Sequence, residues 1–529
     1  MMMRFHGKAA VRALRFSLCF RGRMSPSLRI TTLALCLSAM SLPAQTEPLP
    51  EGSQVAQDAV SAKGLVERFI NARTAGSMDE FIVAVDMVKR RADEGDSFFR
   101  FLLALYAPQE PLCDLPKEKI EAYLKEGRPA VLRAAERDNA MAQYLIGLEA
   151  RSHGNNIAEA ITWFERAARQ ESALALNTLG LMYYTGNGVE KDLHRAALYF
   201  RQAAASGDMN GEYNLGTLYS RGDGVPQDDE MANVLYHRAA GQGHSLAMNN
   251  LGWIYQNGKG NYHQPVKALE WYRKSAECGN REGQYNYGFA LSNGIGCDPN
   301  PRAARIWFFR AAQQGQREAQ VMLGIMCRDG EGVPRDPAKA FEWFTKAADQ
   351  GSAEARYHLG HLYQNGEGTE KDPVRALACF QRASDAGHVP AFHALGLCYY
   401  RGKGVERDYG KAFALFTRAA EAGYPPAQNS LGMLYIRGEG TEKNYVTAAQ
   451  WFNKAWEHRF TDAAFNLAML YEYGQGVTQS RAQAVEYCRK AAKLGHIRAA
   501  EWLAQTGHDL ETTGKRGESN DSETDGETH

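Results

Sequence analysis

A period of 36 residues runs through most of this chain and constrains its fold more than any other feature. A small residue, mostly glycine in the pair Leu-Gly, recurs at this spacing, and a Gly-x-Gly motif recurs in phase with it, as at Gly330 and Gly332. The glycines of the first series are Gly180, Gly216, Gly252, Gly288, Gly324, Gly360, Gly396 and Gly432. Self-similarity at a fixed period is typical of repeat proteins, in which each unit buries its apolar face against the next.

Each repeat is expected to form two helices. Apolar or small residues at Ala175, Leu179, Met182 and Tyr183 follow the helical i, i+4, i+7, i+8 spacing, and the Gly-x-Gly motif supplies the positive φ of a helix exit. The second helix begins after a residue that suits the N-cap, with Gln264 as the exception: Asp192, Asp228, Asn300, Asp336, Asp372, Asp408, Asn444 and Ser480. These carboxylates could suggest acid–base chemistry, but the N-cap position accounts for them.

A glycine inside a helix costs about 1 kcal/mol relative to alanine. Its recurrence in eight copies therefore needs a packing reason. We expect each glycine to let the two helices of a hairpin approach closely, with an aromatic side chain of the second helix over the gap. One hairpin cannot bury its own apolar faces, whereas stacked copies form a solenoid.

The motif Ala-x-x-x-Leu-Gly-x-x-Tyr, Gly-x-Gly-Val, Asp-x-x-Lys-Ala-x-x-Trp-Phe-x-x-Ala-Ala-x-x-Gly resembles the Sel-1-like repeat, a relative of the tetratricopeptide repeat. Residues 319–351 show it almost completely, with Cys327 at the tyrosine position. The resemblance covers residues 140–505 and implies an all-α, right-handed superhelical solenoid of about ten αα-hairpins that serves as an adaptor or scaffold.

The remaining segments divide the chain further. We expect a signal peptide at residues 1–44 and a linker at residues 45–63. A degenerate helical N-terminal cap follows at residues 64–139, and ten repeats span residues 140–496. A C-terminal capping helix at residues 497–505 and a disordered acidic tail at residues 506–529 complete the prediction.

The N-terminal segment predicts export. It is basic and free of acidic residues before Glu47, and an apolar run from Ile30 to Leu42 precedes Pro43-Ala44-Gln45. This is the secretory signal pattern, with Met24 as an alternative start. We expect a periplasmic or secreted protein, with an organelle lumen as the alternative because a transit peptide can share this composition. No apolar stretch long enough for a transmembrane helix follows residue 45.

Net charge argues against a nucleic-acid partner, because Lys+Arg and Asp+Glu are 61 each. The Gly-x-Gly loops lack the Gly-Lys-Ser/Thr of a phosphate-binding loop. His358 and His361, three apart on one helix, are the best metal candidates, but no carboxylate or cysteine converges on them. We therefore expect neither a metal nor another cofactor.

A β-lactamase-like or peptidoglycan-directed enzyme is the alternative that the family resemblance raises, since some members have been associated with β-lactams. Those members carry paired cysteines in each repeat, which this chain lacks, and it contains no Ser-x-x-Lys motif. We expect a non-enzymatic scaffold that binds a protein or peptide.

Two variable positions on the first helices carry the candidate partner-binding residues. One holds asparagines, whose amides can both donate to and accept from the backbone of a bound strand. The second, three residues later, supplies hydrophobic anchors. The candidates are Asn214, Asn250, Asn286, Trp253, Phe289, His358, His361 and Asn466. The alternative for the asparagines is an internal ladder of hydrogen bonds between neighbouring repeats.

Overall fold

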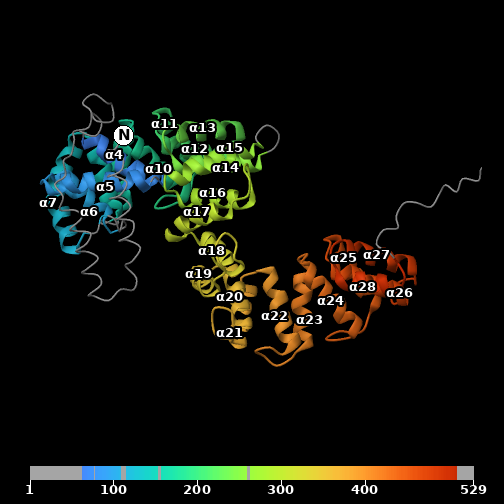
Figure 1. The fold of residues 1–529 in the computed structure, drawn as a ribbon. Coiled ribbons are helices and arrows are strands. Elements are labelled where there is room, and N and C mark those ends of the chain that lie inside the picture. The colour runs from blue at the N-terminus through green and yellow to red at the C-terminus, as the bar shows by residue number, and fades with distance from the viewer. Residues whose placement is uncertain are drawn as a thin grey trace, which may run out of the picture. The chain divides into compact units, whose positions relative to one another are not determined.

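A computed structural model describes residues 62–76, 78–108, 113, 115–152, 156–258 and 263–508. These residues form twenty-five α-helices and no strand (Figure 1). The fold is all-α, as the periodicity predicts. The predicted signal peptide, nearly all of the predicted linker and most of the predicted acidic tail lie outside the described residues.

Four helices precede the first repeat. They are α4 (Ala62–Thr74), α5 (Met78–Asp93), α6 (Ser97–Tyr106) and α7 (Lys117–Glu136). The first of them begins at Ala62 and so includes the last two residues of the predicted linker. Helices α6 and α7 pack as a pair, in the manner of the repeats that follow.

Ten helical hairpins follow, which confirms the predicted number of repeats. The first helices are α8 (Ala140–Ser152), α10 (Ala173–Thr185), α12 (Met209–Arg221), α14 (Ser245–Asn257), α16 (Arg281–Asn293), α18 (Arg317–Asp329), α20 (Ala353–Asn365), α22 (Val389–Arg401), α24 (Pro425–Arg437) and α26 (Thr461–Tyr473). The second helices are α9 (Ile157–Arg169), α11 (Leu193–Ala205), α13 (Asp229–Gly241), α15 (Pro265–Glu277), α17 (Pro301–Gln313), α19 (Pro337–Asp349), α21 (Pro373–Asp385), α23 (Tyr409–Glu421), α25 (Tyr445–Glu457) and α27 (Arg481–Lys493). A last single helix, α28 (Ile497–Gln505), packs on α27.

Local sequence determines where the helices begin and end. The carboxylate of Asp336 accepts a hydrogen bond of 3.1 Å from the backbone N–H of Lys339 and so caps α19. Gln264 precedes α15 and makes no such side-chain bond. Most first helices end on a left-handed glycine, as α20 does at Gly366 with φ of 75°, whereas Gly258 at the end of α14 is extended.

The recurring glycine of the first helix lies against an aromatic ring of the second. A Cβ on Gly360 would come within 2.5 Å of the ring of Phe380, and one on Gly324 equally close to Phe344. These rings are fully buried. Glycine at this position therefore lets the ring pack directly on the backbone of the first helix, which explains its recurrence.

The chain forms two compact units. Unit 1 extends to Ala319 and unit 2 begins at Gln320. Within each unit, buried alanine, leucine and aromatic side chains between the two layers of helices form the core. Among the described residues, no helix combines the length and the apolar character that crossing a bilayer requires.

Candidate binding surface

One side chain per first helix forms an exposed or half-buried stripe in each unit, at the second variable position noted in the sequence. Trp253 is 60% exposed and Leu181 is 44% exposed. The stripe of unit 1 consists of Leu181, Thr217, Trp253 and Phe289. The stripe of unit 2 consists of Ile325, His361, Leu397, Met433 and Met469. Most of these side chains are apolar, so each unit presents a row of hydrophobic contacts to a partner.

The candidate asparagines lie beside the stripe and are hydrogen-bonded to neighbouring repeats. Asn286 donates to the side-chain oxygen of Asn249 at 2.9 Å, and Asn466 donates to Asn429 at 2.8 Å. Each pair joins consecutive first helices. This geometry is that of an internal ladder.

Two further asparagines extend this pattern in unit 1. Asn214 makes a longer contact of 3.4 Å with Asn177 of the preceding repeat. Asn250 is hydrogen-bonded to the hydroxyls of Tyr213 and Tyr236. All four candidate asparagines are half-buried, and their role in binding a partner stays a prediction.

The end of helix α4 covers the starts of three first helices of unit 1. Thr74 donates to Asn210 at 2.9 Å, and Ser245 donates to the carbonyl of Ala75 at 2.5 Å. Gly76, with φ of 70°, lies close to both Ser245 and Asn280. The two hydrogen bonds join residues 136 and 170 positions apart in the chain, and no local pattern in the sequence indicates them.

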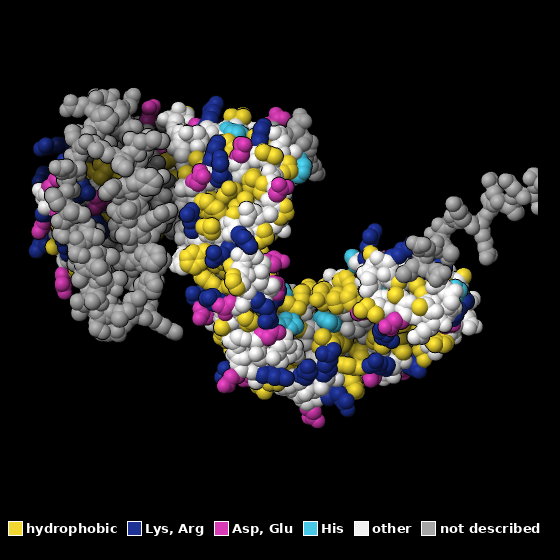
Figure 2. All heavy atoms as spheres, viewed as in Figure 1, with side chains coloured by type: hydrophobic (Ala, Val, Ile, Leu, Met, Phe, Trp, Pro, Cys, Tyr) yellow, Lys and Arg dark blue, Asp and Glu magenta, His cyan; other side chains and the backbone are white. Residues whose placement is uncertain are grey.

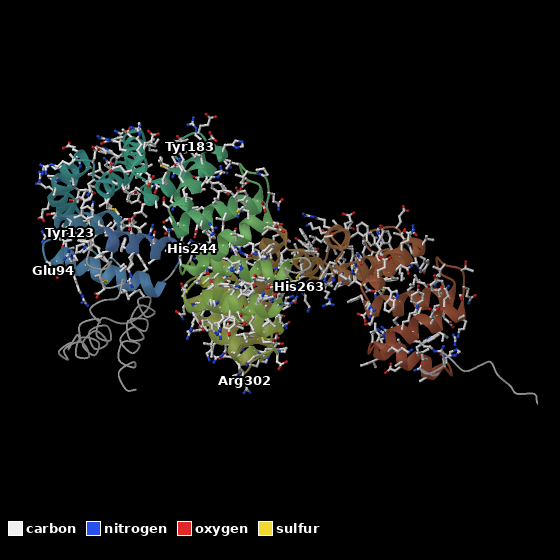
Figure 3. The ribbon with its side chains drawn as sticks, turned by 90° about the horizontal axis from the view of Figure 1, so that it is seen from above. Glu94, Tyr123, Tyr183, His244, His263 and Arg302 are labelled. Carbon is white, nitrogen blue, oxygen red and sulfur yellow. The ribbon has the colours of Figure 1, made fainter. Side chains whose placement is uncertain are left out.

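A neutral histidine lies beside this contact. His244 (labelled in Figure 3) is 1% exposed, stacks on the ring of Tyr213 at 4.4 Å and caps α14 through the N–H of Ala247. Burial lowers its pKa to about 3. Its imidazole is therefore uncharged at neutral pH and acts as a hydrogen-bond acceptor.

Histidine and aromatic side chains gather on the first helices of unit 2. Arg328 donates to Nδ1 of His358 at 2.9 Å, and the ring of His358 stacks on Phe344 at 4.8 Å. His361 packs edge-on against Tyr357 at 4.6 Å. Both histidines are half-buried. Figure 2 shows histidines among apolar side chains on a face of unit 2.

Burial keeps these imidazoles neutral. It lowers the pKa of His358 to about 3, with the Arg328 guanidinium as a second cause, and it also lowers the pKa of His361. Farther along, the pKa of His393 falls to about 4, and its Nε2 lies 3.0 Å from the hydroxyl of Ser430. The described residues contain no group of three histidine, cysteine or acidic side chains that could hold a metal ion.

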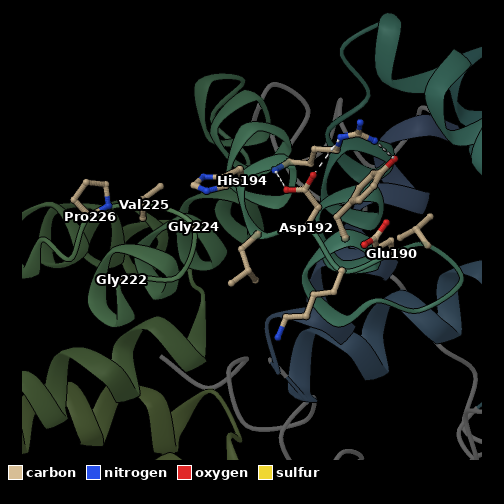
Figure 4. A pocket seen from close by; sticks show the side chains of 12 residues that line it. Glu190, Asp192, His194, Gly222, Gly224, Val225 and Pro226 are labelled. Carbon is tan, nitrogen blue, oxygen red and sulfur yellow. Dashed lines mark hydrogen bonds and ion pairs between the residues drawn. The ribbon is translucent and has the colours of Figure 1, made fainter.

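A large open cleft lies between the Gly-x-Gly loops of two consecutive repeats of unit 1 (Figure 4). Its volume is about 1030 Å³, and its walls include Lys191, His194 and the backbone of Gly224. Arg195 is paired there with Asp192 and with the hydroxyl of Tyr183. Its charge is therefore already balanced.

Comparisons with known proteins agree with this architecture. A family model, Sel1 repeat, matches ten segments that together make up about two thirds of the chain: 140–172, 173–208, 210–244, 245–280, 281–316, 317–352, 353–388, 391–424, 425–457 and 461–496. A search of the curated proteins finds no match.

Two solved structures are among the similar proteins. The first is c5321, a protective antigen present in uropathogenic Escherichia coli strains displaying an SLR fold. It is 29% identical, the match covers 82% of this chain and 99% of that one, and the TM-score is 0.61. The second is a Sel1 repeat protein from Oxalobacter formigenes, also 29% identical, with 47% and 99% of the two chains covered and a TM-score of 0.44.

Proposed function

The chain belongs to the Sel1 repeat family, and from this premise we propose that it is a non-enzymatic scaffold of the cell envelope that binds a protein or peptide along its first helices. The stripe of unit 1 carries the proposal. A tryptophan that is 60% exposed in a well-packed helix gains little from the fold itself. Aromatic anchors of this kind contribute most of the binding energy in many interfaces.

The spacing of the stripe supports an extended ligand. Packed helices lie roughly 8–10 Å apart, and an extended chain advances about 3.3 Å per residue. One stripe side chain therefore serves about every third residue of a bound strand. Trp253 and Phe289, in equivalent positions of consecutive repeats, are the proposed anchors, and Asn214, Asn250 and Asn286 flank them.

Unit 2 offers a corresponding row on its own first helices. Asn466 is the proposed contact near its end, while His358 and His361 present uncharged rings and hydrogen-bonding nitrogens. Low pKa values make these histidines poor proton carriers at neutral pH, because a general acid or base works best near the ambient pH. This favours a binding role over a catalytic one.

Export is part of the proposal. The basic and apolar leader predicts removal of residues 1–44, and the similar E. coli protein is a protective antigen. Mass spectrometry of the chain purified from its native host should find a mature N-terminus at Gln45. An N-terminus at Met1 or Met24 would contradict export.

Site-specific photocrosslinking tests the binding face. The photoreactive amino acid p-benzoylphenylalanine replaces Trp253 in one variant and the control residue Val374 in another. Val374 is 64% exposed and lies on a second helix. Irradiation in living cells of the native host should join the first variant, but not the second, to a discrete partner. Equal labelling at both positions, or none at Trp253, would refute the proposed face.

A further inference from the structure

A small cavity opens among four helices of unit 1. It has a volume of about 160 Å³ and lies between α4, α6, α8 and α10, of which α4 and α10 are adjacent in Figure 1. Its apolar lining consists of Ile70, Leu105, Leu148 and Leu181. Drug-sized ligands usually occupy about 300–1,000 Å³, so this cavity suits a smaller group.

Basic and hydroxyl-bearing residues also line this cavity. Two arginines, Arg73 and Arg151, line it together with the hydroxyl-bearing residues Thr74, Tyr106, Tyr144, Ser152 and Thr178. None of the described residues that line the cavity is acidic. Two cations and no acidic side chain among the described lining residues match an anionic ligand, and arginine is the side chain best suited to bind a carboxylate.

The charges of the two arginines act on Tyr106, a residue of the cavity lining. Both act on the hydroxyl of Tyr106, which is hydrogen-bonded to Tyr144 and whose pKa is raised mainly by burial and lowered in part by Arg73 and Arg151. Arg73 also lies over the ring of Tyr106, at 5.3 Å. Within the described part of the chain, no carboxylate forms an ion pair with Arg151.

Burial divides the cavity into a floor and a mouth. Ile70, Leu105 and Tyr144 are 4% exposed and form the floor. Arg151 and Leu181 are exposed and form part of the mouth. A ligand with a short apolar end and a charged group fits this division, since the apolar part can reach the floor while its charge meets the arginines.

The mouth is continuous with the stripe of unit 1. Leu181 belongs to both, because it is the first residue of the stripe and also lines the cavity. A strand that runs along Phe289, Trp253 and Thr217 therefore reaches the cavity at its end.

We propose that this cavity binds a carboxylate carried on a short apolar stem, and that its ligand is the C-terminal residue of the polypeptide bound along the stripe. The identification of a polypeptide as the source rests on the proposed function. A free short-chain carboxylic acid shares the same chemistry, and the experiment separates the two sources.

Ligand-observed saturation-transfer NMR on the full chain tests the proposal. The probes are N-acetyl-leucine, its C-terminal amide and 4-methylvalerate, a carboxylic acid with the same stem but no amide. We expect N-acetyl-leucine to bind with a Kd of about 1 mM, the amide to bind about tenfold more weakly, and 4-methylvalerate to bind no better than N-acetyl-leucine.

Variants of the two arginines localise the site. Arg151→Met and Arg73→Met should each weaken N-acetyl-leucine binding about tenfold, and Arg151→Glu should abolish it. Arg169→Met is the matched control, because Arg169 is exposed in α9 and does not line the cavity, and it should bind like the parent chain. Far-ultraviolet circular dichroism verifies that each variant is folded.

Each outcome bears on one claim. Binding of the amide as strong as that of the acid, or equal binding by Arg151→Glu and the parent, would overturn the carboxylate site. Tighter binding of 4-methylvalerate than of N-acetyl-leucine would overturn the polypeptide source while leaving the carboxylate site intact. Crosslinking at Trp253 measures the proposed function separately, since that residue lies two repeats away from the cavity.

Discussion

Asn286 donates a hydrogen bond of 2.9 Å to the side-chain oxygen of Asn249 on the preceding first helix. The bond joins two repeats of unit 1 through half-buried amides. We predict that Asn286→Ala lowers the free energy of unfolding by about 1 kcal/mol, because it leaves the oxygen of Asn249 without its donor. Urea unfolding monitored by circular dichroism measures the change.

A control for this prediction lies on the same helix. Asn293 is exposed and donates only to the carbonyl of Phe289 in its own helix, so Asn293→Ala should change stability by less than about 0.5 kcal/mol. Equal stability of the two variants would show that the ladder contributes nothing to the fold and would leave its amides available to a partner.

The contact between Gly360 and Phe380 leads to a second prediction. A methyl group at residue 360 would come within 2.5 Å of the ring, so Gly360→Ala should cost about 1–3 kcal/mol despite the higher helix propensity of alanine. Gly241→Ala is the control, because a Cβ there meets nothing within 4 Å, and it should stabilise the chain by about 0.5–1 kcal/mol. If both variants gained stability, the proposed close packing would be wrong.

Acid should destabilise unit 2 through its histidines. Unfolded histidine takes up a proton near pH 6.5, whereas His358 in the folded chain does so only near pH 3. The unfolded state therefore binds more protons across this window, and stability falls as the pH decreases from 6.5. Arg328, His361 and His388 also disfavour a charge on His358 and so reinforce this effect. Asp329 favours the charge and so works against it.

The variant His358→Asn measures this contribution. The loss of melting temperature between pH 7.5 and pH 5 should be smaller in the variant than in the parent, because one proton-linked group is gone. An unchanged loss would show that His358 does not contribute to the acid response.

Thiol reactivity gives a fourth prediction. Four of the seven cysteines of the described residues, Cys113, Cys327, Cys398 and Cys488, are buried thiols. Burial raises the pKa of Cys398 to about 11 and that of Cys488 to about 12, so both are protonated at pH 8 and shielded from reagents. Ellman's reagent should label them only after denaturation; rapid labelling of the folded chain would contradict their burial.

The sequence predicts those features that depend on neighbouring residues or on the period. Asp336 caps its helix through a residue three positions away, and Gly366 ends one through its own φ, so both follow from local rules. The number of hairpins follows from counting the copies of the 36-residue repeat.

Other features depend on contacts between distant residues. The partner of Asn286 is determined by the register between two helices, which one repeat alone does not specify. The cavity takes residues from four helices, and Arg73 and Arg151 come together only because α4 folds back onto α8 and α10. No position in the 36-residue pattern identifies that arrangement.

The contact between Ser245 and the carbonyl of Ala75 has a consequence for biosynthesis. Ala75 leaves the ribosome 170 residues before its partner. At roughly 5–20 residues per second, the end of α4 remains without this partner for on the order of ten seconds. Helix α4, the first of the described chain, thus reaches its final place only after the start of α14 has been made, and until then its end is available to other proteins.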